Sequence, residues 1–320
     1  MKKVPGVLDL FCGAGGFSEG FKRAGFRILA GVDNDYNAIR SFKTNFPEAY
    51  AIAMDIREVN GRDLLKLIGS KPDVIIGSPP CEPFTGANPK REPLPLDRLY
   101  KDPVGQLVLH FIRIVGEIKP KVFVMENVPA IMDDGLKDEI AKLFRGAGYG
   151  RVYFNVLRAE DYGCPSHRVR VFISNIKLRP RRRVKRVSVA QALRNLPPPG
   201  SWPLNHELPP LSERKLKRIA RLKPGQSLIL YEGAEGRRLP NLIRLEPNKL
   251  APTVLGCSRF IHPYENRFLT VREQARLMGF SDDQVFLGGK DEQYNQVGEA
   301  VPPPLAEAIA LEVKRYLLSS

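Results

Sequence analysis

The chain is organised around Asp73–Thr85, DVIIGSPPCEPFT. Its first four residues, Asp73–Ile76, form a short apolar run rich in β-branched residues, which predicts a buried strand. Pro79 and Pro80 then end the strand and stiffen the following loop, because each proline ring holds φ at roughly −65°. Cys81 therefore stands just beyond a strand end, where ligands bind in an open α/β sheet. A free cysteine is more often a small buried apolar residue, but the flanking prolines favour a nucleophile.

Size and composition predict a globular protein with a polyanionic partner. The chain has 320 residues, long enough for one large domain or two modest ones, and no apolar run is long enough to span a membrane. Its four cysteines are scattered without metal-ligand spacing, which indicates reduced thiols and a cytoplasmic location. The net charge of +15 indicates nucleic acid as the partner. We expect a monomer that does not bind membranes.

The residues before this stretch predict a doubly wound α/β sheet. Val7–Phe11 reads as a first strand, the glycine-rich turn Cys12–Gly16 follows, and a helix begins near Phe17. Glycines let a backbone approach a nucleotide-like ligand closely, although many tight turns carry them for their φ angles alone. A second strand, Arg27–Val32, ends at the acidic segment Asp33–Asp35.

That acidic segment fits two interpretations. A carboxylate at the end of the second strand accepts hydrogen bonds from a ribose in such folds. Asp35 fits equally well as the N-cap of a helix over Tyr36–Phe46. A third strand, Ala49–Ala53, leads to Asp55 and a helix around Asp63–Ile68.

A second carboxylate follows the next predicted strand. A helix over Val104–Ile118 precedes the apolar strand Lys121–Met125, which ends at Glu126. Glu126 could be a surface ion-pair partner, but so apolar a strand should be central, with its end at the same sheet edge as Cys81. Further along, Glu139–Ala147 reads as a helix.

Two later strands complete the predicted sheet. They cover Val152–Leu157 and Arg168–Ser174. Because side chains alternate along a strand, Arg168 and Arg170 should lie on one face of the second of these.

The segment after these strands is basic, rich in proline and poor in strand patterns, and it reads as an inserted second domain. Charge runs are usually solvated faces, but two such runs in an already basic chain favour a surface that contacts phosphates. The candidate residues in these runs are Arg179, Arg181, Arg182, Arg183, Lys185, Arg186, Arg214, Lys215, Lys217 and Arg218. The last four lie on a predicted short helix. Regular patterns then return, with helices over Thr270–Met278 and Pro304–Leu318 and a loop over Tyr294–Pro302.

Taken in order, these stretches closely resemble the C5-cytosine DNA methyltransferase family over nearly the whole chain outside roughly 180–250. The residues that carry the resemblance are Asp9–Phe17, Pro79–Cys81, Glu126–Val128, Ser166–Arg170 and Arg267–Phe280. Four positions depart from the family pattern: Glu82, Thr85, Ser166 and Glu299. Glu299 replaces an Asn of the family and puts a carboxylate near the expected cofactor pocket. None of the four removes a group that the chemistry requires.

The resemblance implies a Rossmann-like fold that transfers a methyl group from S-adenosyl-L-methionine to C5 of a flipped-out cytosine in duplex DNA, with S-adenosyl-L-homocysteine as product. It implies Cys81 as the nucleophile that adds to C6, Glu126 as the acid at N3, Arg170 at the base O2 and Arg168 as support. It places Phe11 on the cofactor adenine, Asp33 on the ribose and Asp55 on the adenine amino group. No metal is needed. The full set implied to bind the cofactor is Phe11, Gly13, Ala14, Gly15, Gly16, Phe17, Asp33, Asn34, Asp55, Ile56, Pro79, Glu299 and Val301.

On this interpretation, residues 1–178 and 290–320 form the catalytic and cofactor-binding domain, and residues 179–289 form the target-recognition domain and hinge. The enzyme would belong to a restriction-modification system, with a cognate restriction endonuclease acting separately. A tRNA cytosine-5 methyltransferase of the same fold is the nearest alternative. An exocyclic-amine DNA methyltransferase and a non-catalytic DNA-binding relative are weaker ones, because Cys81 and Glu126 are both present.

Overall fold

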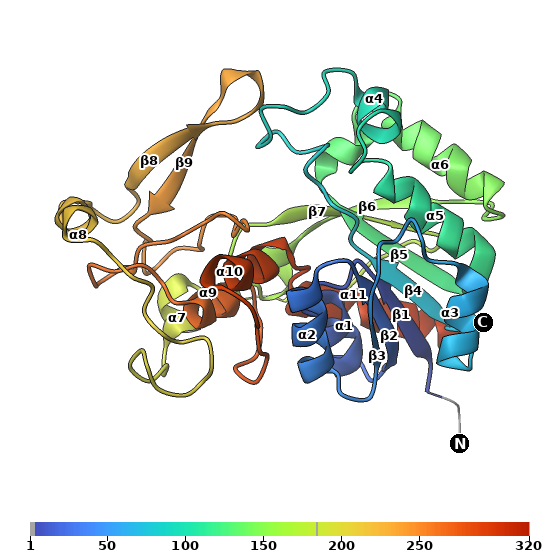
Figure 1. Ribbon diagram of the computed structural model, residues 1–320, viewed down its shortest axis with the longest axis horizontal. Helices are drawn as coiled ribbons and strands as arrows, with labels where there is room; N and C mark the ends of the chain where they lie inside the picture. Colours follow the sequence, from blue (N-terminus) through green and yellow to red (C-terminus); the bar gives the residue numbers. More distant parts are fainter. Residues whose placement is uncertain (1–3, 184, 320) are drawn as a thin grey trace.

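The larger of two lobes in the computed structural model is built on a seven-stranded sheet (Figure 1). The structure describes residues 4–183 and 185–319, so Val184 in the basic run lies outside the described residues. The spatial order of the strands is β3-β2-β1-β4-β5-β7-β6. The strands are β1 (Gly6–Leu10), β2 (Arg27–Asp33), β3 (Tyr50–Ala53), β4 (Val74–Gly77), β5 (Val122–Asn127), β6 (Tyr153–Arg158) and β7 (Val169–Ser174).

One antiparallel strand determines which residues meet at the edge of the sheet. β1 to β5 pair in parallel, whereas β7 pairs antiparallel with both β5 and β6. Because β7 runs in the opposite direction, its first residues lie where the parallel strands end. The beginning of β7 therefore lies at the edge of the sheet where β4 and β5 end and their following loops start.

Helices cover both faces of the sheet, as the alternation of strand side chains requires. Val122 and Val124 of β5 belong to one buried cluster, and Phe123 and Met125 belong to the other. The first face is covered by α1 (Gly16–Arg23), α2 (Tyr36–Asn45) and α11 (Pro303–Ser319), and the second by α3 (Gly61–Ile68), α5 (Leu107–Ile118) and α6 (Leu136–Gly146). This arrangement confirms the predicted doubly wound α/β class.

The second lobe has its own small cores. One buried cluster joins α7, α9 and α10, and a smaller one lies beside α8 and a β-hairpin. The elements of this lobe are α7 (Val189–Leu193), α8 (Glu213–Ile219), β8 (Ser227–Glu232), β9 (Arg238–Ile243), α9 (Val271–Leu277) and α10 (Lys290–Glu299). In Figure 1 the hairpin rises on one side and meets the segment before α4 (Pro95–Tyr100), which arrives from the other lobe.

Two local predictions were wrong. The segment expected to be poor in strands contains the hairpin β8–β9, and most of the loop expected over Tyr294–Pro302 belongs to α10. Gly298 lies inside this helix, where a Cβ would come within 2.2 Å of the Leu255 backbone carbon. The predicted helix over Val104–Ile118 begins later, at Leu107.

Within the described part of the chain, none of the helices combines the length and the apolar character that a membrane crossing demands.

Candidate active site

Three neighbouring strands bring Cys81, Glu126 and Arg170 to one edge of the sheet. Cys81 follows β4 through the two prolines, Glu126 lies near the end of β5, and Arg170 lies near the start of β7. The loop turns sharply at the cysteine, since the backbone N–H groups of Phe84 and Thr85 both donate to the Cys81 carbonyl, at 3.0 and 3.0 Å. Cys81 is half-buried in this turn. The predicted nucleophile and the predicted acid thus share a site.

Both oxygens of the Glu126 carboxylate are held by other side chains. Glu126 is 4% exposed, so it is no surface ion-pair partner. The Arg170 Nε donates to Oε1 at 2.9 Å, and the Ser78 hydroxyl donates to Oε2. A third contact ties the same strand to the nucleophile loop, because the Asn127 side-chain amide donates to the Pro79 carbonyl at 3.1 Å. The carboxyl group is therefore oriented before any substrate arrives.

Arg168 joins the sheet edge to the second lobe. Its guanidinium donates to the Val254 carbonyl at 2.8 Å, and its backbone N–H donates to the Glu160 carboxylate at 3.2 Å. Burial, followed by the charge of Arg170, lowers the pKa of Arg168. The two arginines therefore differ in their contacts: Arg170 contacts the acid, and Arg168 supports the wall of the site.

The Cys81 thiol experiences opposed influences. Burial raises its pKa above the ordinary value, and the Glu126 carboxylate adds to the effect. The positive charges of Arg170 and Arg168 act in the other direction, but burial is the larger influence. The thiol form is therefore favoured in the free protein.

The loop between β1 and α1 has the strained backbone that a close ligand contact requires. Phe11, which is not a glycine, has φ 60°, and Gly13 and Gly15 have φ 53° and 94°. The Gly13 N–H donates to an Asp33 carboxylate oxygen at 2.8 Å, which joins the ends of β1 and β2. A Cβ at Gly16 would come within 2.7 Å of the Val301 carbonyl, so the loop also lies against the start of α11.

The remaining predicted cofactor residues lie around this loop. Burial raises the pKa of Asp33, whose other oxygen accepts from the Asp35 N–H at 3.0 Å. Asp35 itself caps α2 through the N–H groups of Asn37 and Ala38, as one of the two interpretations predicted. The rest comprise the buried Ala14, Phe17, Ile56 and Pro79, the exposed Asn34, and Asp55, which pairs with Arg57 at 3.4 Å.

Glu299 adds an unusual negative charge to the same cleft. It stands at the end of α10, and a Cβ at Gly256 would touch its carboxylate at 2.9 Å. The residue as a whole is exposed, but neighbouring groups surround its carboxyl, and desolvation, followed by the carboxylates of Glu82, Asp33 and Asp35, raises its pKa. The departure from the family pattern therefore places a carboxyl with a raised pKa beside the predicted cofactor residues.

The two basic segments have different surroundings. Arg182 and Arg186 pair with Asp161, at 3.7 and 3.5 Å, and Arg181 and Arg183 line a hollow against α11. The run therefore lies along the α11 side of the larger lobe and is not brought to Cys81. Its members Arg179 and Lys185 are exposed.

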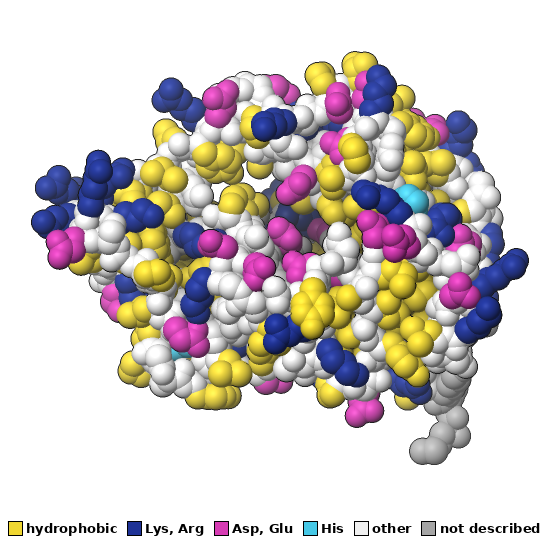
Figure 2. Space-filling view, viewed as in Figure 1, with side chains coloured by type: hydrophobic (Ala, Val, Ile, Leu, Met, Phe, Trp, Pro, Cys, Tyr) yellow, Lys and Arg dark blue, Asp and Glu magenta, His cyan; other side chains and the backbone are white. Residues whose placement is uncertain are grey.

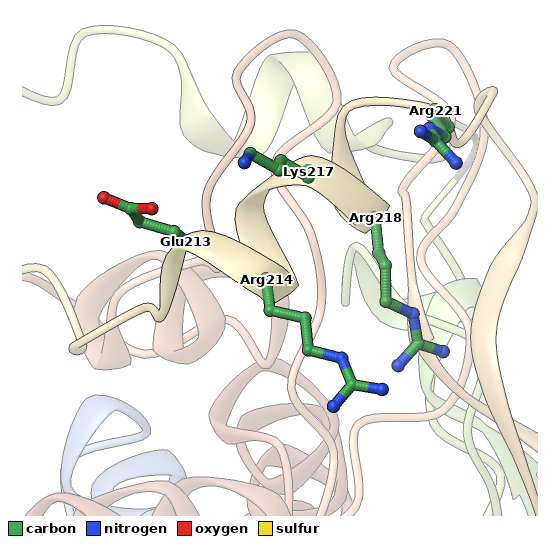
Figure 3. Close-up of a pocket in the computed structure, with 5 residues that line it drawn as sticks. All are labelled: Glu213, Arg214, Lys217, Arg218 and Arg221. Atoms are coloured by element: carbon green, nitrogen blue, oxygen red, sulfur yellow. The ribbon is translucent and has the colours of Figure 1, made fainter.

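Helix α8 presents its charges at the far end of the smaller lobe, where Lys and Arg side chains gather in Figure 2. Arg214, Lys217, Arg218 and Arg221 line a shallow hollow of about 420 Å³, and Figure 3 shows Arg214 and Arg218 extending from the same side of the helix. Lys215 is exposed on the same helix.

Sequence reasoning missed Ser78 and the hairpin contact with the nucleophile loop. Ser78 immediately precedes the two prolines, but no local pattern indicates that its hydroxyl reaches a residue 48 positions away. Likewise, the Ala234 N–H of the hairpin turn donates to the Gly86 carbonyl at 2.9 Å, and Arg91 pairs with Glu235 at 2.8 Å. Both contacts depend on pairing between distant segments.

Comparison with known proteins shows which family the chain resembles. The model of the C-5 cytosine-specific DNA methylase family matches residues 6–315. A protein of Methanocaldococcus jannaschii, provisionally named a type II methyltransferase, is 51% identical over 97% of this chain and 99% of its own length. The type II methyltransferase M.DdeI of Desulfomicrobium norvegicum is 33% identical over 97% of this chain and 88% of its own. A solved E. coli prophage protein, provisionally described as a DNA modification methyltransferase, has a TM-score of 0.79 at 27% identity, covering 98% of this chain and 99% of its own.

Proposed function

The chain belongs to the C-5 cytosine-specific DNA methylase family and is therefore a DNA methyltransferase, and we propose how its residues divide the reaction. The observation that carries the proposal is the shared edge at which Cys81 follows β4 and Glu126 ends β5, with Arg170 paired to Glu126 at 2.9 Å. Cys81 is the nucleophile, Glu126 the acid at N3, Arg170 a contact of the base, and Arg168 its support.

The order of steps follows from the chemistry of cytosine. C5 is a poor nucleophile, so the Cys81 sulfur first forms a bond to C6, and the displaced electron pair is accepted at N3, which takes a proton from Glu126. S-adenosylmethionine, when bound, supplies the methyl group that C5 then attacks. The C5 proton then passes to water, its electron pair re-forms the double bond between C5 and C6, and the sulfur leaves C6 as a thiolate. The N3 proton returns to Glu126, which restores the aromatic base.

The cysteine must lose its proton before it can attack. Because burial raises the pKa of the Cys81 thiol, the free enzyme has little thiolate at neutral pH. Arg170 and Arg168 stabilise the thiolate once it forms. The target base must also leave the DNA stack, at a cost of about a few kcal/mol. The Cys81 thiolate is needed only once that base has entered the site.

The loop after β1 fits the expected methyl donor. Its positive φ angles at Phe11, Gly13 and Gly15 bend the backbone at the sheet edge, and a Cβ built on Gly13 would meet no atom within 4 Å. Space therefore opens beside this loop, next to the Asp33 carboxylate, whose chemistry suits ribose hydroxyls. We assign Phe11 to the adenine, Asp33 to the ribose and Asp55 to the adenine amino group. Ala14, Gly15, Gly16, Phe17, Asn34, Ile56, Pro79, Glu299 and Val301 would complete the wall.

We assign recognition of the DNA target to residues 179–289, which form most of the smaller lobe; α10 packs against them. Helix α8 supplies the first phosphate contacts, because Arg214, Lys215, Lys217 and Arg218 are exposed. In the other run, Arg179, Arg181, Arg183 and Lys185 stay available, whereas Arg182 and Arg186 already face Asp161. A restriction-modification setting follows from the type II relatives, and a cognate endonuclease would act separately.

Trapping with 5-fluorocytosine tests the assignment. Fluorine cannot leave C5 as a cation, so the reaction should stop after methyl transfer with sulfur still bound to C6. We expect a denaturation-resistant adduct with duplex DNA that carries 5-fluorocytosine at the site mapped in a host expressing this chain. The adduct should require S-adenosylmethionine, should disappear with Cys81→Ala and should persist with Cys257→Ala. An adduct that survives Cys81→Ala would refute the nucleophile, and one formed only with fluorinated tRNA would move the substrate to RNA.

A further inference from the structure

Ser78 contacts the predicted acid directly, and it comes from the strand that carries the nucleophile. It follows Gly77, the last residue of β4, and its hydroxyl donates to the Glu126 Oε2. The backbone N–H of Ser78 also donates to the Leu10 carbonyl at 3.3 Å, which places the residue between β1 and β5. Ser78 therefore lies where the ends of β1, β4 and β5 meet.

A purely structural role does not account for this hydroxyl. The nucleophile loop and β5 are already joined through Asn127 and the Pro79 carbonyl at 3.1 Å, and the backbone of Ser78 is held by Leu10. The hydroxyl adds a bond to the carboxylate itself. We therefore expect the Ser78 hydroxyl to influence the orientation of the Glu126 carboxyl group and which of its two oxygens carries the proton.

The chemistry of the two partners distinguishes the two oxygens of Glu126. An arginine only donates hydrogen bonds, so the Oε1 that faces Arg170 stays an acceptor throughout. A serine hydroxyl can donate to an ionised oxygen or turn and accept from a protonated one. The Oε2 that faces Ser78 is thus the oxygen that can exchange a proton without losing its partner.

We propose that Ser78 is a positioning residue for the reaction, which holds Glu126 in both of its protonation states while Arg170 fixes its orientation. The proposal rests on the function assigned to Glu126 above. The other charged groups that share this site are Arg168, just before β7, and Glu299 at the end of α10, with the Cys81 thiol beside them. Among the described residues, none of these three forms a hydrogen bond to Oε2.

Substitution of the hydroxyl tests the proposal. With Ser78→Ala, kcat should fall by about tenfold or more, the range expected for losing a hydrogen bond to a charged group. The DNA KM and the affinity for S-adenosylmethionine, measured by calorimetry, should change by less than about threefold. The alkaline limb of the kcat profile, where a required acid loses its proton, should move to higher pH, because the ionised carboxylate of Glu126 loses a donor. Ser78→Thr keeps a hydroxyl, and should restore most of the rate and the profile.

Ser41→Ala is a matched control. Ser41 is buried in α2 and bonds Gln296 at 2.7 Å, away from Cys81, so its loss should lower stability without moving the pH profile. An unchanged kcat and profile in Ser78→Ala, or a threonine variant as slow as the alanine one, would overturn the proposal. Wild type that forms no 5-fluorocytosine adduct would refute the proposed function instead, whereas a Ser78→Ala enzyme that traps as fast as wild type would refute only the role of Ser78.

Discussion

Cys81, the proposed nucleophile, lies in surroundings that favour its protonated form. Its thiol is half-buried, and burial raises its pKa more strongly than Arg170 and Arg168 lower it. A thiol rather than a thiolate is the less reactive form toward oxidants and alkylating agents. The site therefore protects its cysteine in the free enzyme, and DNA binding must supply what removes the proton.

Alkylation as a function of pH measures this balance. We expect the rate of Cys81 modification by iodoacetamide to rise with a midpoint above 9.0, the ordinary pKa of a cysteine thiol, because the thiolate is the reactive form. Arg170→Gln removes the charge that lowers the pKa of Cys81, so its midpoint should move further up. Mass spectrometry of the Cys81 peptide gives the rates.

The control for this measurement is Arg179→Gln, which removes an equal charge from the exposed basic run. It should leave the Cys81 midpoint where it was. Two results would contradict the claim that burial raises the pKa of Cys81 more than the arginines lower it. One is a wild-type midpoint below the ordinary pKa of a thiol, and the other is an Arg170→Gln midpoint at lower pH than that of wild type.

Among the elements, the hairpin β8–β9 reaches across to the loop that carries Cys81. The contact consists of the bond from the Ala234 N–H to the Gly86 carbonyl and the ion pair between Arg91 and Glu235. Glu235 has φ 59° and ψ 30°, a left-handed backbone that a glutamate rarely adopts. The turn therefore keeps a strained residue at the position that binds the nucleophile loop.

Glu235→Gly should loosen the loop while changing the stability of the protein little. An exposed ion pair contributes about 0.2–1 kcal/mol, and glycine recovers a similar amount by relieving the positive φ. We expect the free energy of unfolding to change by less than about 1 kcal/mol, while amide hydrogen exchange rises in residues 84–94.

Arg237→Gln serves as the comparison. Arg237 pairs with the other carboxylate oxygen of Glu235, at 3.8 Å, so its loss leaves the bond to Arg91 in place. Exchange in residues 84–94 should then match wild type. Equal exchange in all three proteins would show that the hairpin does not restrain this loop.

At the scale of the whole molecule, the positive charge is divided between two surfaces. Basic side chains of α8 stand at the far end of the smaller lobe (Figure 2). The run that begins at Arg179 lies along α11 of the larger lobe. Carboxylates gather between the lobes around the site, including Glu82 and Glu299. DNA phosphates should therefore be held by the smaller lobe while the target base enters the cleft.

The salt dependence of DNA binding distinguishes the two surfaces. Neutralising Lys217 and Arg218 to Gln should weaken binding to all sequences about equally and flatten the slope of log affinity against log salt by about 2, at about 0.9 per lost contact. Neutralising Arg182 and Arg186 should change the slope much less, because both face Asp161. Titrations at four salt concentrations measure the slopes. Equal slopes for wild type and the α8 variant would mean that this helix is only a solvated face.

Short stretches of the sequence by themselves determined the fold class and the strand ends that carry the predicted site residues. The apolar run before Ser78, the two prolines and the glycine-rich turn each act through their own backbone, so the strand ends bearing Cys81, Asp33 and Glu126 could be placed from the sequence. The same holds for the N-cap of α2, because Asp35 bonds residues only two and three positions away. The doubly wound class followed from these alternating units.

Contacts between residues far apart in the sequence were decided only by the tertiary structure. The antiparallel direction of β7 brings Arg170 to Glu126, and packing of β4 against β5 brings Ser78 to the same carboxylate. The hairpin β8–β9 forms in a segment expected to be poor in strands, and Pro240 is accommodated because a two-stranded sheet has only edge strands. Helix α10 forms where a loop was expected, because Tyr294 and Val297 are buried and Gly298 permits close approach to Leu255. Such contacts are stabilised by the burial of apolar surface between distant segments, and no local stretch of sequence specifies that burial.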